Sequence, residues 1–294
     1  MSFRLAVAVV LAVLLSSSAI AVSTPKAVLL GSFPWQGKQA WFGGFSALEM
    51  APDGGSMTVL SDRSTIATAR IQRDGDQITS VQFTASNKLR SSKNKILSGG
   101  VGDSEGLVVT GNGDLFISFE GVHRVARYDT LSGISNVLPR PKAFRTLSRN
   151  GSFESLAMDA QGRLYTMPEA NRDINGNIPV YRWDGRRWST PFSLPATHGF
   201  LPVGADFDAQ GRLYVLERGT SVLGFRSQLR RWTVTNAGLS QPETLLKTGS
   251  GVHDNLEGVS IWRDDRNRLR ATMVSDDNFM FFQRTELVEY VLPN

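Results

Sequence analysis

Carboxylate residues recur at the same point of a sequence pattern that the chain uses five times. The pattern is plainest where Asp103 and Glu105 open an apolar run and Glu120 closes the next one. Carboxylate oxygens, together with side-chain carbonyls such as those of Asn255 and Asn278, are the ligands that hard cations such as Ca²⁺ prefer. A cation held beside Arg and His residues could polarise a phosphate or an ester and activate water. The pattern therefore predicts a divalent-cation site suited to hydrolysis.

Each copy of the pattern is typical of a β-hairpin. Two apolar-rich strands flank a turn of Gly, Asn or Asp residues, as at Gly111–Asp114. The copies align on Leu48, Leu107, Leu156, Ala205 and Val259, with spacings of 59, 49, 49 and 54 residues. Repeats of this length in a β-rich chain indicate a β-propeller. We therefore expect an all-β fold of five blades, or of six if the N-terminal region contains a degenerate blade.

The last repeat is one strand short, because it supplies only three strands before the chain ends. The segment Ala27–Phe33 is predicted to be a lone strand. It would complete the last blade, join the two ends of the chain and remove open sheet edges. No segment after residue 21 is predicted to form a helix. We expect residues 22–294 to form one domain.

Antiparallel pairing places the start of each innermost strand and the end of the second strand at one face of the propeller. Turn residues such as Asp53 and Asn112 fall on the other face, where turn chemistry explains them. The residues placed on the opening face are Asp62, Asp103, Glu105, Glu120, Glu154, Glu169, Glu217, Asp254, Glu257, Asp276, Asp277, His123, His198, His253, Arg63, Arg172, Arg218 and Arg284. Carboxylates this close would raise one another's pKa unless a cation or an Arg lay between them.

A purely structural role explains the same repetition. Asp and Glu at strand ends often accept hydrogen bonds from backbone N–H groups of a neighbouring loop, and such a role would recur in every blade. The doubled charge of Asp276 and Asp277 exceeds what that role requires. Gly102–Gly106 also matches the nucleophile-elbow pattern, but an elbow needs a strand–turn–helix and Ser104 precedes a strand, so it is not predicted to be a nucleophile.

The first 21 residues are predicted to be a signal peptide. Arg4 precedes the apolar run Leu5–Leu15, which is too short to span a bilayer core of ~30 Å, and a small-residue cleavage site ends at Ala21. We therefore expect a secreted or periplasmic protein with no integral membrane segment after cleavage. The chain has no Cys, which excludes disulfides and thiolate metal sites. Its net charge of +5 comes from dispersed residues, so nucleic-acid binding is not predicted.

Several motifs resemble the phytase-like family, also described as having esterase-like activity of phytase. The run Ser275–Phe279, then Gln283–Thr285 and a closing strand at Leu287–Tyr290, resembles the C-terminal motif of that family. Asp254–Gly258, Asp103–Gly106, Ser118–Gly121 and Leu216–Arg218 resemble its internal motifs. The similarity covers Phe45 to Leu292. It departs at Ser155, Val203 and Met280–Phe282. The resemblance implies an exported β-propeller rich in acidic residues, with a suggested esterase or phosphoesterase activity.

These observations together predict a metal-dependent phosphoester hydrolase, acting as a monomer on a small phosphorylated molecule and holding Ca²⁺ at its mouth. A lactonase or esterase, and a propeller that binds a ligand or partner without catalysis, stay open as alternatives because propellers host all three. The predicted cation ligands are Glu105, Glu120, Glu169 and Asp276; the predicted catalytic residues are Glu257, Asp276, Asp277, His253 and Arg284; and the predicted substrate-binding residues are Arg63, Arg218 and His123.

Overall fold

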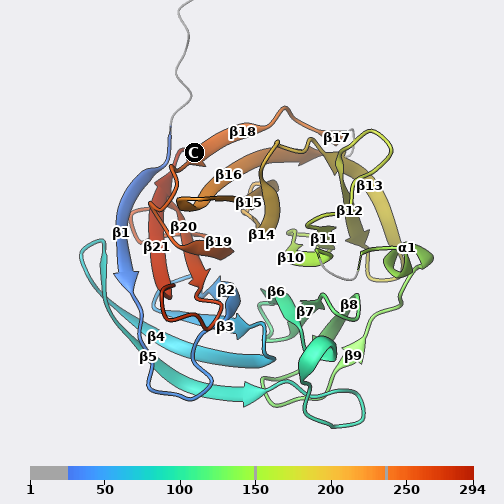
Figure 1. The fold of residues 1–294 in the computed structure, drawn as a ribbon, viewed down its shortest axis with the longest axis horizontal. Helices are drawn as coiled ribbons and strands as arrows, with labels where there is room; N and C mark the ends of the chain where they lie inside the picture. Colours follow the sequence, from blue (N-terminus) through green and yellow to red (C-terminus); the bar gives the residue numbers. More distant parts are fainter. Residues whose placement is uncertain (1–25, 149–150, 236–237) are drawn as a thin grey trace, which may run out of the picture.

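The computed structural model describes residues 26–148, 151–235 and 238–294. Its strands form five sheets around a central axis (Figure 1). In the first four sheets the strands follow one another from the axis outward in chain order, each antiparallel to the last. The predicted five-bladed propeller is therefore confirmed. The predicted signal peptide, residues 1–21, lies outside the described residues.

The blades are numbered in chain order. Blade 1 contains β2 (Phe45–Met50), β3 (Ser56–Ser61), β4 (Thr65–Asp74) and β5 (Gln77–Lys88). Blade 2 contains β6 (Ser104–Val109), β7 (Leu115–Phe119), β8 (Arg124–Tyr128) and β9 (Asn136–Val137). Blade 3 contains β10 (Phe153–Met158), β11 (Leu164–Pro168), β12 (Ile178–Trp183) and β13 (Trp188–Leu194). Blade 4 contains β14 (Leu201–Phe207), β15 (Arg212–Ser221), β16 (Gly224–Thr235), β17 (Gly238–Leu239) and β18 (Glu243–Lys247).

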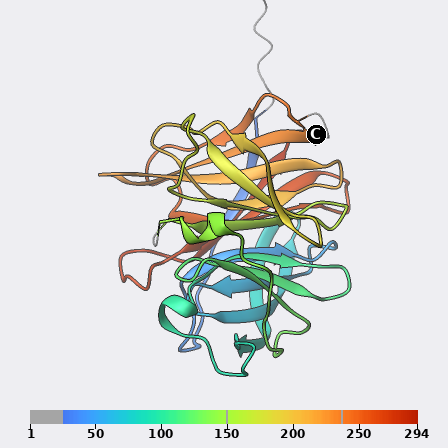
Figure 2. The ribbon, with the colours of Figure 1, turned by 90° about the vertical axis from the view of Figure 1, so that its right-hand side faces the viewer.

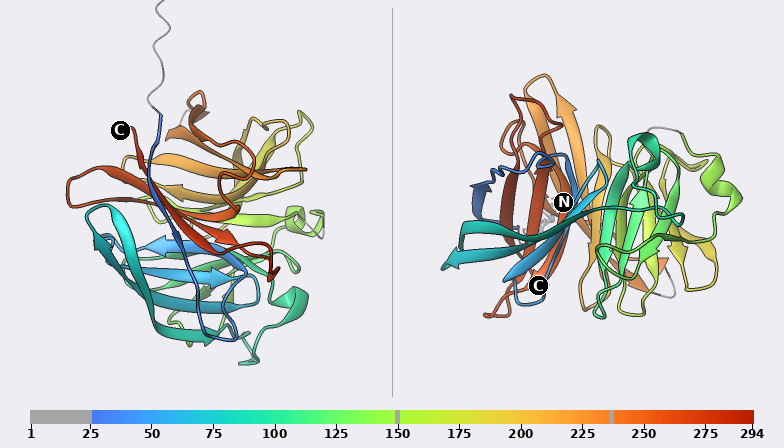
Figure 3. Two further views of the ribbon diagram at one scale, coloured as in Figure 1. Left: turned by 60° about the vertical axis from the view of Figure 1, so that its left-hand side comes forward. Right: turned by 90° about the horizontal axis from the view of Figure 1, so that it is seen from below.

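Blade 5 is closed by the N-terminal strand, as the sequence predicts. It contains β19 (Asn255–Arg263), β20 (Leu269–Asp276) and β21 (Glu286–Leu292), and β1 (Val28–Pro34) pairs antiparallel with β21 along its outer edge. Figure 3 shows β1 running beside β21. The sheet order β1-β21-β20-β19 thus joins the first described strand to the last, which leaves no gap in the ring of blades.

One local feature differs from the sequence prediction, which expected no helix. The chain between blades 2 and 3 includes a single helical turn, α1 (Lys142–Arg145), which buries Phe144. The outer hairpin of blade 1 is long, with ten and twelve residues in β4 and β5. A short 3₁₀ turn, η1 (Gly99–Val101), precedes β6. None of the described helices is long and apolar enough to cross a bilayer.

The hydrophobic core lies between neighbouring blades. Tyr214 and Leu216 of blade 4, for example, pack in one buried cluster with Val259 and Met273 of blade 5. The strands alternate such inward-facing apolar residues with polar ones. On the face opposite the mouth, turn carboxylates have the structural role predicted for them. The Oδ1 atom of Asp208 accepts hydrogen bonds from the backbone N–H groups of Gln210 (2.9 Å) and Arg212 (3.0 Å).

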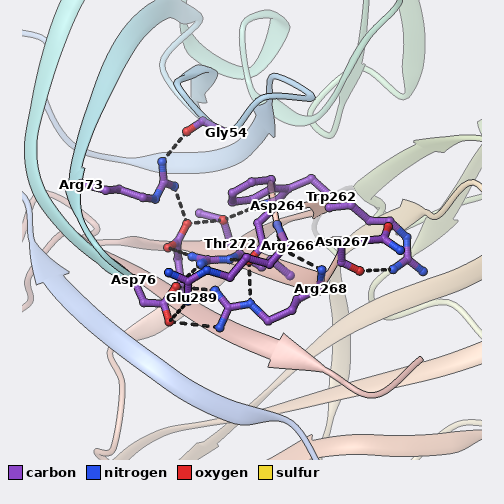
Figure 4. Close-up of polar contacts among 12 residues, drawn as sticks. Gly54, Arg73, Asp76, Trp262, Asp264, Arg266, Asn267, Arg268, Thr272 and Glu289 are labelled. Atoms are coloured by element: carbon purple, nitrogen blue, oxygen red, sulfur yellow. Dashed lines mark hydrogen bonds and ion pairs between the residues drawn. The ribbon is translucent and has the colours of Figure 1, made fainter.

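A cluster of buried charges ties blade 5 to blade 1 (Figure 4). Arg270 of β20 lies at its centre, only 3% exposed, and pairs with Asp264 (2.8 Å), with Glu289 of β21 (3.2 Å) and with Asp76 in the β4–β5 turn. Arg268 also binds Asp76 and Asp264, and Arg73 of β4 binds Glu289 at 2.7 Å. We call these six residues the closure cluster, because they join the last blade to the first.

An acidic pair lies toward the end of the innermost strands that is distant from the mouth. It consists of Asp206, which is buried, and Glu49, which is partly exposed. Burial raises the pKa of Asp206 to about 7, and burial with the nearby Asp206 raises the pKa of Glu49 well above its usual range. A pKa raised by folding gives stability that is full below the unfolded-state pKa and lost as the pH rises through the folded-state pKa.

We therefore expect Glu49→Gln to reduce the fall in melting temperature between about pH 5 and about pH 8, since it removes one of the two groups that must stay protonated. Thermal melts of the variant and the wild-type protein, followed by circular dichroism at both pH values, measure this difference. Equal pH dependence in the two proteins would contradict the expectation.

Candidate metal centre at the mouth of the propeller

Each innermost strand contains a β-bulge near its start, at equivalent positions in all five blades. The pairing register shifts between Phe45 and Ala47, Ser104 and Leu107, Phe153 and Ser155, Pro202 and Gly204, and Leu256 and Gly258. A bulge leaves a residue unpaired and redirects its side chain. The residues at these bulges, which we call the inner ring, are Ser46, Glu105, Glu154, Val203 and Glu257.

A second ring follows from the same register. In each blade, the second strand pairs with the bulged strand, and one residue follows directly after the residue paired with the start of the bulge. In blades 1 to 5 these residues are Asp62, Glu120, Glu169, Arg218 and Asp276. We call these five the outer ring. The two rings thus bring seven carboxylates and one guanidinium to the mouth, and only blade 4, with Val203 and Arg218, contributes no acid.

Small residues beside the bulges let the innermost strands approach closely. A Cβ atom added to Gly204 would lie 2.5 Å from the carbonyl oxygen of Glu257, and one added to Gly258 would lie 2.9 Å from the Cα of Ala47. The central cavity below the rings has a volume of only about 10 Å³, roughly the space of one water molecule. Any larger ligand of this site therefore binds at the mouth and does not enter the axis.

The ring carboxylates raise one another's pKa. Burial, followed by the charges of Glu154 and Glu257, raises the pKa of Glu105 well above its usual range, and burial with Glu169 does the same to Glu154. Burial is also the main cause that raises the pKa of Glu257 to about 7 and that of Asp276 to about 8. The mouth therefore holds several carboxyl groups that favour either a proton or a bound cation at neutral pH.

Arg218 neutralises one side of the mouth. Its guanidinium donates to Glu169 of blade 3 (2.6 Å), to Glu257 of blade 5 and to the Oδ1 of Asn255 (3.1 Å). Asn255 in turn donates to Glu257 at 2.9 Å. The carboxylates flanking blade 4 thus already have a cationic partner, whereas Asp103, Glu105 and Glu120 of blade 2 form no ion pair with any Lys, Arg or His that the structure describes.

Asp103, Glu105 and Glu120 of blade 2 form the cluster best suited to a cation. One oxygen from each lies within 4.8 Å of the others. The carboxyl groups of Asp103 and Glu105 are close enough to share a hydrogen bond, and two carboxyl groups can do so only when one of them holds a proton. A divalent cation that replaced the proton would satisfy all three groups. Glu120 also accepts from the backbone N–H groups of Gly151 and Ser152, the latter at 3.1 Å, which fix its position.

The two consecutive aspartates of blade 5 differ in their surroundings. Asp276 lies in the outer ring beside Glu257 and Asp62, whose charges contribute to its raised pKa. Asp277 instead accepts from the backbone N–H of Gly44 (2.9 Å) and Phe279 (3.0 Å) and from the hydroxyl of Thr285 (3.0 Å). Its oxygens therefore hold the loop after β20, as the structural interpretation of strand-end acids predicts.

Four other predicted site residues lie around the rings. His123 is buried with its ring 6.3 Å from that of Phe153. His253 is buried against Tyr290, with its Nε2 2.7 Å from the hydroxyl oxygen. Arg284 is 53% exposed and pairs with Glu286 at 3.4 Å. Arg63 is exposed, and its guanidinium carbon lies 3.3 Å from the centre of the Phe279 ring. None of these four contacts involves an acid of the two rings, but the charge of Arg63 partly offsets the burial that raises the pKa of the neighbouring Asp62 to about 6.

A pocket of about 390 Å³ opens beside the mouth, between blades 3 and 4. Arg172, His198 and Arg218 line it together with the apolar ring of Phe200. Because Arg218 belongs both to this pocket and to the outer ring, the pocket adjoins the carboxylates. The sequence placed Arg172 and His198 on this face but gave them no role.

Ser104 of the nucleophile-elbow pattern has no catalytic surroundings. It is completely buried, its hydroxyl donates to the backbone carbonyl of Ser61 at 2.7 Å, and a strand, not a helix, follows it. The prediction that Ser104 is not a nucleophile therefore agrees with its environment.

Comparison with known proteins decides the family. The family model described as phytase-like, esterase-like activity of phytase, matches residues 40–279. The chain belongs to this family. The phytase-like match extends from the segment before β2 into the loop after β20 and so includes both rings. A search of curated proteins finds no match to the sequence.

Three solved structures are similar in fold to this phytase-like propeller. The catalytic domain of a GH62 α-L-arabinofuranosidase from Coprinopsis cinerea has a TM-score of 0.54 at 12% identity, covering 92% of this chain and 99% of that one. The PQQ-bound aldose sugar dehydrogenase of Streptomyces coelicolor has a TM-score of 0.48 at 13% identity, over 92% of this chain and 100% of that one. Virginiamycin B lyase from Staphylococcus aureus has a TM-score of 0.47 at 11% identity, over 91% and 100%.

Proposed function

We propose that the protein is an exported, metal-dependent phosphoester hydrolase whose active site is the mouth of the propeller. The observation that carries the proposal is the cluster of Asp103, Glu105 and Glu120, three carboxyl groups within 4.8 Å of one another with Glu105 buried. All-oxygen ligands of high charge favour Ca²⁺ over softer metals. Membership of the phytase-like family supports a phosphorylated substrate.

The residues of the mouth divide into three groups by their surroundings. Asp103, Glu105 and Glu120 would hold the cation, which supplies positive charge to polarise a phosphoryl oxygen. Glu257 and Asp276, with pKa values of about 7 and about 8, can exchange a proton near neutral pH and are placed to act as general base or acid. Glu169 is paired with Arg218 in this arrangement, so we assign it to positioning that arginine.

The neighbouring pocket gives a place for the anionic part of the substrate. Arg172 and Arg218 present guanidinium groups, whose fork geometry suits phosphate oxygens, and Phe200 offers an apolar wall. Arg63 at the rim adds a further cation. Catalytic roles for Asp277, His253 and Arg284, and substrate binding by His123, stay predictions. Asp277 binds the N–H of Gly44, His253 binds Tyr290, and Arg284 is exposed beside Glu286.

Removal and restoration of calcium tests the proposal. The purified protein without its signal peptide is stripped with EDTA, and its melting temperature is recorded with and without Ca²⁺. A ligand that binds only the folded state stabilises it by about 2.7 kcal/mol at a hundredfold excess over Kd. We expect such a rise together with Ca²⁺-dependent hydrolysis of aryl phosphate mono- or diesters.

The other outcomes separate the alternatives. Stabilisation by Ca²⁺ without turnover of phosphate esters, but with turnover of lactones or carboxylic esters, would favour the esterase hypothesis. Stabilisation without turnover of any of these would favour a metal-supported binding protein. If neither Ca²⁺ nor another divalent cation shifts the melting temperature, the metal centre is wrong and the ring acids act as ordinary buried carboxyl groups.

A further inference from the structure

Large apolar side chains project into solvent from the loops that follow the second strands of blades 3, 4 and 5. Ile174 follows β11, Val222 and Leu223 form the β15–β16 turn, and Phe281 and Phe282 lie in the loop after β20. Their exposed fractions are 100%, 102%, 77%, 98% and 66% in that order. Single exposed apolar residues are ordinary on protein surfaces, but five on three equivalent loops form a pattern. We call these loops the three tips.

The three tips lie on the same face as the carboxylate mouth, because they continue from the strand ends that carry the outer ring. Figure 2 shows the β15–β16 hairpin and the loop after β20 projecting from the same side of the disc. The tips are separate protrusions around the mouth and do not merge into one flat patch. Such a shape suits insertion into a soft surface better than contact with a rigid protein partner.

The tips are held outward by hydrogen bonds. In the loop after β20, the backbone N–H of Met280 donates to the carbonyl of Asp277 (2.7 Å) and that of Gln283 to the carbonyl of Met280 (3.0 Å). In the β15–β16 turn, the N–H of Leu223 donates to the hydroxyl of Ser221 at 3.1 Å. The exposed side chains of these two loops are therefore held by hydrogen-bonded turns.

Basic residues stand at the base of the tips of blades 4 and 5. Arg284, 53% exposed, follows Phe282 by two residues. At the base of the β15–β16 hairpin, the guanidinium carbon of Arg226 lies 4.9 Å from the Phe200 ring centre and the ammonium of Lys247 lies 5.3 Å from the same centre. Apolar side chains beyond a band of cations match the acyl and headgroup layers of an anionic bilayer.

We propose that the mouth face docks on an anionic lipid bilayer, with the three tips inserted among the acyl chains and Arg226, Lys247 and Arg284 against the headgroup phosphates. The acids of the rings lie at the strand ends, whereas Ile174, Val222 and Phe281 come five, four and five residues after the outer-ring position of their blade. The tips therefore extend beyond the acids, which do not oppose this docking. The proposal concerns a peripheral attachment and does not depend on the hydrolase activity.

Vesicle co-sedimentation tests the proposal with the exported protein, whose N-terminus is first verified by mass spectrometry so that the apolar run Leu5–Leu15 does not contribute. We expect binding to vesicles of equal parts phosphatidylcholine and phosphatidylglycerol, weaker binding to pure phosphatidylcholine, and a decrease at high salt. The double variant Phe281→Ser/Phe282→Ser should bind at least about tenfold more weakly, since membrane affinity scales with the buried apolar area.

The control is Val28→Ser on the outer strand β1, which removes a 62% exposed apolar residue outside the three tips. It should bind as the wild-type protein does. Wild-type protein that stays in the supernatant with both kinds of vesicle would overturn the proposal, and the tips would then have to serve a protein partner. An equal loss in the Val28→Ser and Phe281→Ser/Phe282→Ser variants, or no loss in the latter, would overturn it as well.

Discussion

Replacing Glu105 by Gln is expected to abolish the stabilisation that Ca²⁺ gives the wild-type protein, and to lower phosphoesterase turnover by about 100-fold or more. Glu105 is the buried member of the cluster with Asp103 and Glu120. An amide keeps the shape of the side chain but offers one neutral oxygen in place of the charge that a cation requires. Differential scanning fluorimetry with Ca²⁺ or EDTA, and steady-state assays on the same samples, measure both effects.

The change in melting temperature that Glu105→Gln causes without metal distinguishes a metal-binding role of the ring acids from a purely structural one. In EDTA, burial and then the charges of Glu154 and Glu257 raise the pKa of Glu105 and so disfavour its ionised form. The variant should therefore melt at the same temperature as the wild-type protein or higher when no metal is present. A carboxylate that served only as a structural acceptor would instead lower the melting temperature in EDTA and in Ca²⁺ alike, and that result would argue against the metal centre.

The matched control makes the same chemical change far from the mouth. Glu243→Gln on β18 alters a 48% exposed side chain that pairs with Arg231 at 2.6 Å. We expect it to lose at most ~1 kcal/mol of stability and to keep the full response to Ca²⁺. A loss of the calcium response in this variant too would show that the response reports general stability and not the mouth.

The fold could be predicted from the sequence because one hairpin pattern is repeated along the chain. Five copies of one hairpin pattern give the blade number, and the missing fifth-blade strand points to the N-terminal segment that becomes β1. Antiparallel pairing then decides which face collects the acids. Each of these inferences uses local pattern and strand order alone, which a single sequence contains.

Which acids face the axis could not be predicted in the same way. Asp276 and Asp277 are adjacent and chemically identical, yet one joins the outer ring and the other binds the N–H of Gly44. Consecutive side chains of a strand point to opposite faces, and Asp276 is still paired with Asn255 whereas Asp277 follows the last residue of β20. A glycine follows Glu105, Val203 and Glu257 in the sequence. These glycines mark the bulges of blades 2, 4 and 5, and they were the sequence signal that could have located the inner ring.

No local sequence pattern predicts the ion pairs of the closure cluster. Asp76 lies 192 residues before Arg268 and 194 before Arg270, so neither spacing nor composition connects them. Their contact exists because the ring closes and brings the β4–β5 turn of blade 1 against β20 of blade 5. Strand pairing within blades could be foreseen from pattern, whereas side-chain contacts between the first and last blades depend on the completed ring.

Replacing Arg270 by Met is expected to lower the free energy of unfolding by about 3–5 kcal/mol, because it removes the most buried cation of the closure cluster. Arg270 is 3% exposed and pairs with Asp264, Glu289 and Asp76. Arg268 and Arg73 remain beside these carboxylates, and methionine fills a similar volume, so the loss comes mainly from the three ion pairs of Arg270. Urea denaturation at neutral pH, followed by tryptophan fluorescence, gives the midpoint and slope from which the change is calculated.

Arg266→Met provides the control, since it removes the same kind of charge from the edge of the same cluster. Arg266 is 62% exposed and approaches Asp76 only to 4.0 Å, so we expect a change of ~1 kcal/mol or less. Similar midpoints for the two variants would mean that the buried pairs are not what joins blade 5 to blade 1.

The stability of the protein at low pH provides an independent test of the ion pairs of Asp76. The hydrogen bond from Arg268 is the main cause that lowers the pKa of Asp76 to about 2. A depressed pKa gives stability that is full above the unfolded-state value of about 3.9 and is lost as the pH falls through the folded-state value. The wild-type protein should therefore lose this contribution between about pH 4 and about pH 2, and Asp76→Asn, which cannot ionise, should lack that part of the acid dependence. Both results would follow only if the ionised Asp76 holds the first blade to the last.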